Sequence, residues 1–260
     1  MLRDLWIHRD LLWLLTVREI RIRYARTLLG LGWALFIPVA QMTVFTVLDF
    51  QRLLRADGPY AGLPYTVFAF LGILPWTHFA ASLGQATPSL VVGANMLKKS
   101  AFPREVLPLS KVLAAVLDLC VGILVLAGLM AWKGLPLRAA ALAVPLVFLL
   151  QFLFTAGLAL LFSAGNMFFR DVNYLVTVGL LLGMFATSVV YPVSFTNPPW
   201  VASVLALNPM SSFLDTYREA ILLGRWPGAT LLPGAAGAVL AIVVGSAVFR
   251  RLSPRFAEEV

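Results

Sequence analysis

The sequence predicts an all-helical integral membrane protein. Of its 260 residues, 60% are hydrophobic and 12% are charged, whereas soluble domains average about 45–50% apolar and about 25% charged residues. The apolar residues form continuous runs near the length of about 20 that a helix needs to cross a bilayer. A helix pairs its backbone groups within the segment, and the alternating ten-residue pattern of barrel strands is missing. We therefore expect one α-helical membrane domain over residues 1–260.

Six runs are the expected spanning helices, and they divide the chain into an interfacial segment, a bundle and a tail. The runs cover about 28–50, 65–92, 108–132, 139–164, 173–193 and 231–249. The segment 1–27 precedes the six-span bundle of residues 28–250, and residues 251–260 form the expected cytoplasmic tail. The one cysteine, Cys120, lies inside the third run, so no disulfide can form within the chain.

The segment 1–27 mixes hydrophobic residues with scattered arginines. This pattern is typical of a helix that lies in the membrane interface, with tryptophan at the headgroups and arginine toward water and phosphate. Glu19 and Arg23 are spaced to pair along such a helix. The alternative is an ordinary positive flank of the first span. The residues expected to serve the interfacial helix are Trp6, Trp13, Arg18, Arg21 and Arg23.

The positive charges predict the orientation. The net charge is +8, and cytoplasmic loops of membrane proteins are enriched in Lys and Arg. The N-terminus, the loop after the second run, Arg170 and the C-terminus together hold more than twice as many of these residues as the opposite connections, among which we count Arg138 and Arg218. We expect both termini in the cytoplasm of a bacterial inner membrane, and no nucleic-acid binding.

An apolar stretch of residues 194–227 lies between the fifth and sixth runs and is interrupted by prolines. Two short helices that separate at Asn208 and Pro209 fit this pattern, and neither is long enough to span. They could form a re-entrant hairpin in the outer leaflet, which is tolerated where protein or water covers the backbone. The alternative is a surface loop with amphipathic helices.

The residues needed for catalysis or nucleotide binding are scarce. The sequence has no HExxH or CxxC motif, and it lacks the GxxxxGK[ST] phosphate loop. We expect no metal and no cofactor in this chain. His78 is more simply a packing residue than a ligand. Asp118 lies within the third run, where a charge is costly in lipid, so we expect it to pair with Lys111 or with another helix.

The loop after the second run is the most specific feature of the sequence. A short basic segment that contains Lys98 and Lys99 leads into Phe102-Pro103-Arg104-Glu105, and Pro108 then stands at the start of a span. The stretch resembles the corresponding loop of type-2 ABC exporter permeases, most closely the subunits that export lipid-linked O-antigen polysaccharides. Other stretches agree in order, namely 18–24 with 29–33, 169–172, 191–193, 207–210 and 217–219.

The resemblance implies a permease that works as a homodimer with two copies of a separate ATPase subunit, which binds ATP and Mg. The coupling helix would then contain Lys98, Lys99, Phe102, Pro103, Arg104 and Glu105. The first and fifth spans would line a conduit at the dimer axis, with Gly30, Gly32, Pro38, Gln41, Gly179, Gly183 and Tyr191. An outer gate would contain Trp200, Asn208 and Pro209.

Other polymers and other classes of protein remain open at this stage. The same architecture would serve capsule, teichoic acid or another cell-envelope polymer. An integral membrane enzyme would need clustered acids, histidines or a metal site at one interface. A channel or scaffold would lack an ATPase partner. The sequence cannot identify the glycan or its lipid carrier.

Overall fold

The computed structural model describes residues 2–25, 27–30, 32–47, 59–99, 102–192 and 199–257, and in these ranges it contains helices and turns but no strand. For some helical residues, including Pro38, Gln41, Lys98 and Lys99, the backbone alone is described. Among the described residues, four helical stretches are long and apolar enough to cross a membrane, at Tyr65–Ala86, Val106–Trp132, Ala139–Phe168 and Ala229–Phe256. They correspond to the second, third, fourth and sixth runs.

The first and fifth runs form shorter helices. Helix α3 covers Gly32–Val47 and α9 covers Asp171–Phe185, with 16 and 15 residues. At a rise of about 1.5 Å per residue, α9 is roughly 22 Å long, less than a hydrocarbon core of about 30 Å. The second run also ends early: α4 stops at Ala86, and a separate turn of helix follows. The six-span count therefore stays a prediction.

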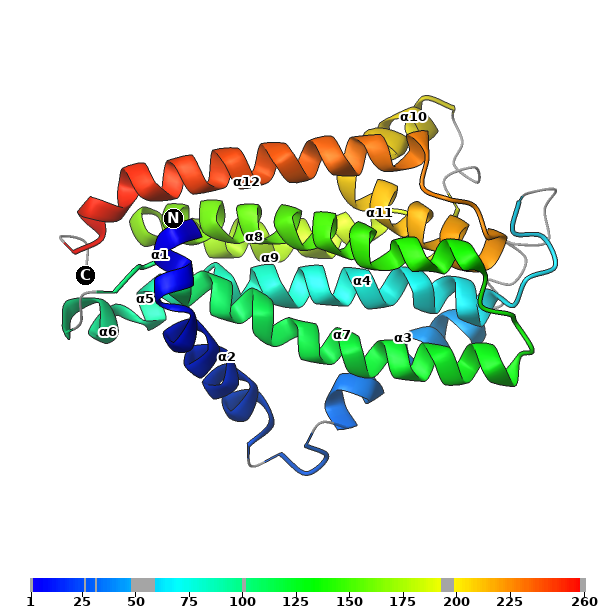
Figure 1. The fold of residues 1–260 in the computed structure, drawn as a ribbon, viewed down its shortest axis with the longest axis horizontal. Coiled ribbons are helices and arrows are strands. Elements are labelled where there is room, and N and C mark those ends of the chain that lie inside the picture. Colours follow the sequence, from blue (N-terminus) through cyan, green and yellow to red (C-terminus); the bar gives the residue numbers. More distant parts are fainter. Residues whose placement is uncertain are drawn as a thin grey trace.

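The long helices lie side by side, and the short ones gather at the two ends (Figure 1). The long helices are α4 (Tyr65–Ala86), α7 (Val106–Trp132), α8 (Val144–Phe168) and α12 (Leu232–Leu252). One end holds α1 (Leu2–Ile7), α5 (Ser89–Val92), α6 (Ala94–Lys99) and a 3₁₀ turn (Ser253–Ala257); the other holds α10 (Pro199–Leu207) and α11 (Pro209–Arg218). Helix α2 (Arg9–Tyr24) runs obliquely away from the first end and contacts α7.

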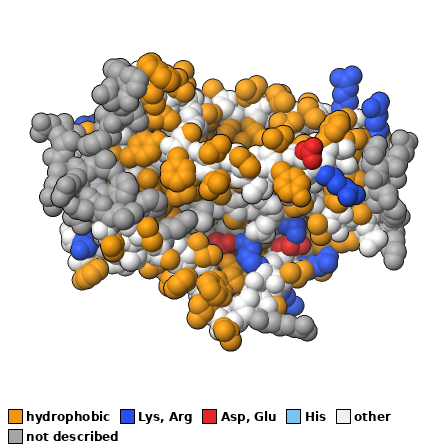
Figure 2. Space-filling view, turned by 180° about the vertical axis from the view of Figure 1, so that it is seen from behind, with side chains coloured by type: hydrophobic (Ala, Val, Ile, Leu, Met, Phe, Trp, Pro, Cys, Tyr) orange, Lys and Arg blue, Asp and Glu red, His pale blue; other side chains and the backbone are white. Residues whose placement is uncertain are grey.

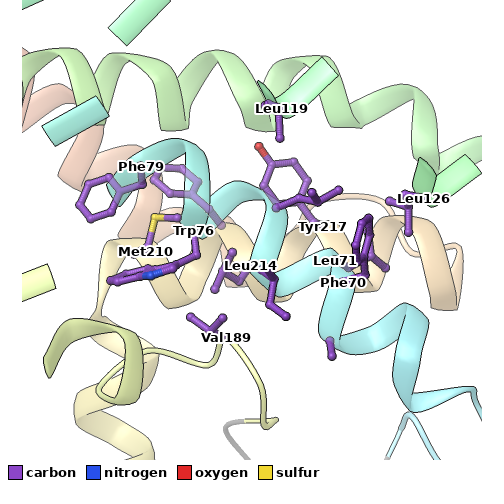
Figure 3. Close-up of a cluster of buried hydrophobic side chains, with 14 of the residues drawn as sticks. Phe70, Leu71, Trp76, Phe79, Leu119, Leu126, Val189, Met210, Leu214 and Tyr217 are labelled. Atoms are coloured by element: carbon purple, nitrogen blue, oxygen red, sulfur yellow. The ribbon is translucent and has the colours of Figure 1, made fainter. Parts of the chain in front are cut away.

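Helix α4 is the centre of the bundle. It contacts α3, α7, α8, α9 and α11, and most of its side chains are buried. Figure 3 shows Phe70, Trp76 and Phe79 of α4 packed with Leu214 and Tyr217 of α11. Because α4 is enclosed by protein, it needs no lipid-facing stripe, and its mean hydropathy of 1.4 is lower than that of the other three candidate spans.

Helices α8 and α12 pack closely because glycines remove side chains from their contact. A Cβ at Gly157 of α8 would meet the backbone of Ala241 and Ile242, and a Cβ at Gly245 of α12 would meet the backbone of Gly157. Small residues allow membrane helices to approach at backbone distance. The spacing of Gly237, Ala241 and Gly245 along α12 was the signal for this contact, and our sequence analysis missed it.

The outer surface of the bundle is hydrophobic. Figure 2 shows the back of the molecule covered mainly by apolar side chains. Large exposed hydrophobics lie along α9 and α12, and they include Leu175, Leu181, Leu240 and Val243. A soluble monomer rarely exposes apolar area on this scale, so lipid or other protein must cover it. The fold is that of a multi-pass membrane protein.

Candidate functional site

The loop predicted to couple to an ATPase lies at the end of the bundle that also holds α1 and the C-terminal turn (Figure 1). Helix α6 carries Lys98 and Lys99, whose side chains lie outside the described residues. Phe102 is partly buried against an apolar cluster that includes Leu15 and Leu107. Glu105 immediately precedes α7. The backbone of this segment is thus held by α7 and the helices beside it.

Arg104 is directed into the protein. Its guanidinium donates a hydrogen bond to the carbonyl of Ser253 and lies over the ring of Phe256, 5.9 Å from the ring centre. Phe256 is fully buried, with its ring centre 5.3 Å from that of Phe249 and 5.9 Å from that of Phe168. Arg104 therefore joins the loop to the C-terminal turn, a contact that the sequence did not predict.

Helix α2 is held against α7 by two ion pairs. Glu19 pairs with Lys111, and Arg23 pairs with Asp118. The predicted pairing of Glu19 with Arg23 along one helix is wrong, because each finds an opposite charge on α7. For Asp118, the alternative of a partner on another helix is correct.

The pair of Arg23 and Asp118 belongs to a larger polar cluster. Arg23 also donates to the Gln85 side-chain oxygen at 2.7 Å, and the Tyr24 hydroxyl donates to Asp118. Burial, reinforced by the hydrogen bond and charge of Asp118, raises the pKa of Tyr24 to about 12. The phenol is therefore protonated at neutral pH and remains a donor to the carboxylate.

The other residues expected in the interfacial helix point outward. Trp6 and Trp13 are 71% and 68% exposed, and the Arg9 guanidinium lies over the Trp6 ring at 5.1 Å. Arg21 is exposed, and Arg18 donates a weak hydrogen bond to the sulfur of Met96 in α6 at 3.4 Å. Exposed tryptophan beside arginine is the composition expected where a helix meets lipid headgroups.

The predicted conduit residues occupy two helices that both pack on α4. Gly30 has a positive φ of 52°, which suits a turn before α3, and Gly32 begins that helix. The side chains of Pro38 and Gln41 lie outside the described residues. Helix α3 contacts α4 and α7, whereas α9 contacts α4 and α8. Within one protomer, α3 and α9 thus flank the same central helix.

Gly179 and Gly183, which form a GxxxG motif in the fifth run, have different surroundings. A Cβ at Gly179 would meet nothing within 4 Å, whereas a Cβ at Gly183 would lie 3.1 Å from the Trp76 ring. Among the residues that the structure describes, the motif therefore brings no second helix to backbone distance. Tyr191 is half-buried, and its hydroxyl donates to the carbonyl of Phe185, the last residue of α9.

The segment between the fifth and sixth runs forms the two predicted short helices, α10 and α11, separated at Asn208. Asn208 caps α11 by accepting a hydrogen bond from the Met210 N–H at 2.9 Å, and Pro209 occupies the first helical turn. The Asn208 amide also donates to the Ala186 carbonyl at 3.1 Å, just beyond α9. Trp200 on α10 is 66% exposed.

Arg218, at the end of α11, is the most deeply buried charge among the described residues. Its side chain is fully enclosed and donates to the carbonyls of Phe68, Ser188 and Val189 and to Asp215. The guanidinium lies 3.8 Å from the centre of the Phe68 ring. Counting Arg218 among the outer-loop charges was therefore wrong, because it belongs to the interior of the fold.

Gly72 makes this arrangement possible. A Cβ at Gly72 of α4 would collide with the Val189 carbonyl and with the Arg218 guanidinium. Arg218 thus joins three segments: the N-terminal half of α4, the chain after α9, and α11. The sequence signal was an arginine beside an acid inside a largely apolar stretch, since such charges need partners in a membrane protein.

Together these features define a multi-pass helical membrane protein with a polar cluster between α2 and α7 and a buried arginine at the end of α11. A model of the ABC-2 type transporter family matches residues 10–222. The chain therefore belongs to the ABC-2 type transporter family.

Three relatives are similar over nearly their full length, and each is called O-antigen export system permease protein RfbA. Two are from Klebsiella pneumoniae, at 30% and 31% identity, and both alignments cover 96% of this chain and 94% of the relative. The third is from Myxococcus xanthus and is 34% identical, with 100% and 99% covered. The family resemblance inferred from the loop and the flanking stretches is confirmed.

Proposed function

We propose that this chain is the permease subunit of an ATP-driven exporter that moves a lipid-linked polysaccharide, such as O-antigen, across the cytoplasmic membrane. The observation that carries the proposal is the similarity to three O-antigen export permeases along almost the whole chain. The relatives' names favour O-antigen over capsule or teichoic acid.

The family supports a complex in which this chain forms the membrane path and a separate subunit hydrolyses ATP. ABC-2 permeases are the membrane subunits of ABC transporters, so a partner must supply ATP hydrolysis and the bound Mg. We propose that two ATPase copies dock at the end formed by α1, α6 and the C-terminal turn. That end presents basic and aromatic groups, of which Trp6, Arg251 and Arg255 are exposed.

We propose a homodimer in which α3 and α9 contribute to the conduit, with six spans per chain and both termini in the cytoplasm. The exposed apolar face of α9 suits a partner subunit, since it leaves Gly179 open to close approach. The hairpin of α10 and α11 would form the outer gate.

Deletion and complementation test the function. A strain that lacks this chain should lose its surface polysaccharide, accumulate the lipid-linked precursor inside, and recover when the chain and its ATPase are returned together. Normal surface polysaccharide in the deletion strain would contradict the proposal. Antibody against the polymer then identifies the exported glycan.

The coupling assignment has its own test, because Arg104 also holds the C-terminal turn. Phe102→Ala and Arg104→Ala should lower transport-coupled ATPase activity while insertion and dimerisation persist. If Arg104 acts through the turn, Phe256→Ala should produce the same loss. If Arg104 contacts the ATPase directly, Phe256→Ala should leave coupling near wild type. Unchanged rates in all three variants would refute the role of this loop.

Orientation is tested by cysteine labelling after Cys120 is replaced. A cysteine at Trp226, which is exposed at the α10–α11 end, should react with an impermeant reagent added to intact cells. A cysteine at Arg251, exposed at the opposite end, should react only after lysis. The reverse pattern would invert the predicted topology.

A further inference from the structure

A cavity of about 360 Å³ lies between α2, α3, α4 and α7, so it includes the predicted conduit helix α3 but not α9. Its lining includes Arg23, Tyr24, Trp33, His78, Gln85 and Asp118. The volume falls within the range of roughly 300–1,000 Å³ that is usual for small-molecule sites. Asp118 lies twelve residues beyond the start of α7, roughly 18 Å along the helix. The cavity therefore lies near the middle of α7, which has 27 residues.

The hydrogen-bonding groups of this cavity are partly unused. His78 also lines the cavity, but its ring is only 2% exposed and packs against Phe148 and Phe152 of α8, with ring centres 5.4 and 6.5 Å away. The Gln85 oxygen accepts from Arg23, and its amide nitrogen has no partner in the described part of the chain. This amide nitrogen is therefore available to a ligand in the cavity.

The electrostatics of the lining disfavour an anion. Arg23 is already neutralised by Asp118, and Tyr24 donates to the same carboxylate. A phosphate offers acceptors only, and it would compete with Asp118 for these donors. A hydroxyl group both donates and accepts. It can therefore accept from the Gln85 amide and donate to a free lone pair of an oxygen in the lining.

The aromatic side of the cavity suits a ring with apolar faces. Trp33 of α3 is 40% exposed, and its ring centre is 5.5 Å from that of Phe36 in an edge-on arrangement. Trp33 thus offers a supported face next to the polar cluster. Planar polar side chains beside an exposed indole match a sugar ring, whose faces carry C–H groups and whose rim carries hydroxyls.

We propose that this cavity binds the membrane-proximal sugar ring of a lipid-linked glycan while its lipid chain stays in the cytoplasmic leaflet. The assignment rests on the proposed export function and adds a substrate-binding site to it. The ion pairs between α2 and α7 form one wall of the cavity. The sugar therefore binds beside the Arg23–Asp118 pair and leaves it intact.

Binding to the purified full chain in lipid nanodiscs tests the site. The probe is a polyprenyl diphosphate that carries one hexose, and the comparison compound is the same polyprenyl diphosphate without sugar. The sugar-bearing probe should bind at least about tenfold more tightly, the equivalent of one or two hydrogen bonds. Equal affinity of the two lipids would overturn the proposal and would indicate that the diphosphate or the chain is recognised instead.

Variants locate the binding. Gln85→Leu should weaken the sugar-bearing probe about threefold to tenfold and leave the sugar-free lipid unchanged. Ala81→Leu should do so by filling the cavity, whereas Ala131→Leu, the same change at an exposed site on α7, should not. If neither cavity variant alters binding, the site is elsewhere.

Photochemical labelling keeps the test independent of variant folding. A hexose probe with a photoreactive substituent should label wild-type peptides from α2, α3, α4 or α7 around the cavity. Labelling confined to α9 would place the sugar at the other face and overturn the assignment. Because export in cells is measured separately, intact export with no sugar discrimination would remove the site and leave the proposed function standing.

Discussion

Two arginines, Arg218 and Arg23, have their charges stabilised by different kinds of partner in this largely apolar protein. Arg218 is fully enclosed and shares its donors among three backbone carbonyls and Asp215. Arg23 keeps 19% of its side chain exposed and bonds to Asp118 and Gln85. The first joins three segments of backbone, and the second fastens one helix to another through side chains. Loss of Arg218 should therefore damage the fold, whereas loss of Arg23 should loosen α2.

The largest effect is expected from Arg218→Leu. The change leaves three buried carbonyls and Asp215 without their donor, and breaking a buried charged pair costs about 3–5 kcal/mol. We expect little folded protein, measured by size-exclusion chromatography of a fluorescent fusion in detergent. Arg218→Lys should give a yield of folded protein between those of the wild type and Arg218→Leu. A lysine ammonium lacks the planar set of donors with which the guanidinium reaches all three carbonyls. Wild-type thermal stability for Arg218→Leu would refute the structural role.

Gly72→Ala should have the next largest effect. The added Cβ would meet the Val189 carbonyl and the Arg218 guanidinium, and overpacking of this kind costs about 1–3 kcal/mol. Gly84→Ala is the matched control in the same helix, since a Cβ there meets nothing within 4 Å. The control should keep or slightly raise the melting temperature, because alanine favours a helix. Equal melting temperatures would mean that α4 and Arg218 are not closely packed.

The cluster at Arg23 should give a smaller but measurable coupling. Arg23→Gln and Asp118→Asn should each lower stability, and the double variant should lose less than the sum. A double-mutant cycle on thermal unfolding should return about 1–2 kcal/mol, within the range for residues in one network. Strict additivity would show that the two side chains do not interact in the membrane.

The pair of Glu19 and Lys111 should give the smallest effect. Its side chains are 16% exposed, slightly less than those of Arg23 and Asp118, but neither shows a further hydrogen bond in the described structure. Glu19→Lys and Lys111→Glu should each cost about 1 kcal/mol, near the upper end for exposed ion pairs. The doubly reversed variant should regain most of that loss. Protease susceptibility of the segment before Tyr24 is the measurement. If the double variant is as susceptible as either single one, the pair does not hold α2.

Much of the fold could be predicted from the sequence because long hydrophobic runs indicate membrane helices directly. The third, fourth and sixth runs agree with α7, α8 and α12 to within a few residues, and the break at Asn208 follows from its capping side chain and from Pro209. The loop predicted to contact an ATPase was singled out by its local pattern of lysine, proline and arginine, and this role stays a prediction. The partners of charged residues were harder to predict from the sequence. Glu19 and Arg23 have the spacing of a pair along one helix, yet both bind to residues of α7.

The sequence by itself determined the helical membrane class, the order of the apolar segments and the family, since each rests on local composition or on the order of short motifs. Only the tertiary structure decided which polar residues meet. It turned Arg104 toward Phe256, enclosed Arg218 beside Gly72, and placed His78 and Gln85 at one cavity. The physical reason is that a charge removed from water must be paired, and the fold determines which partner lies close enough.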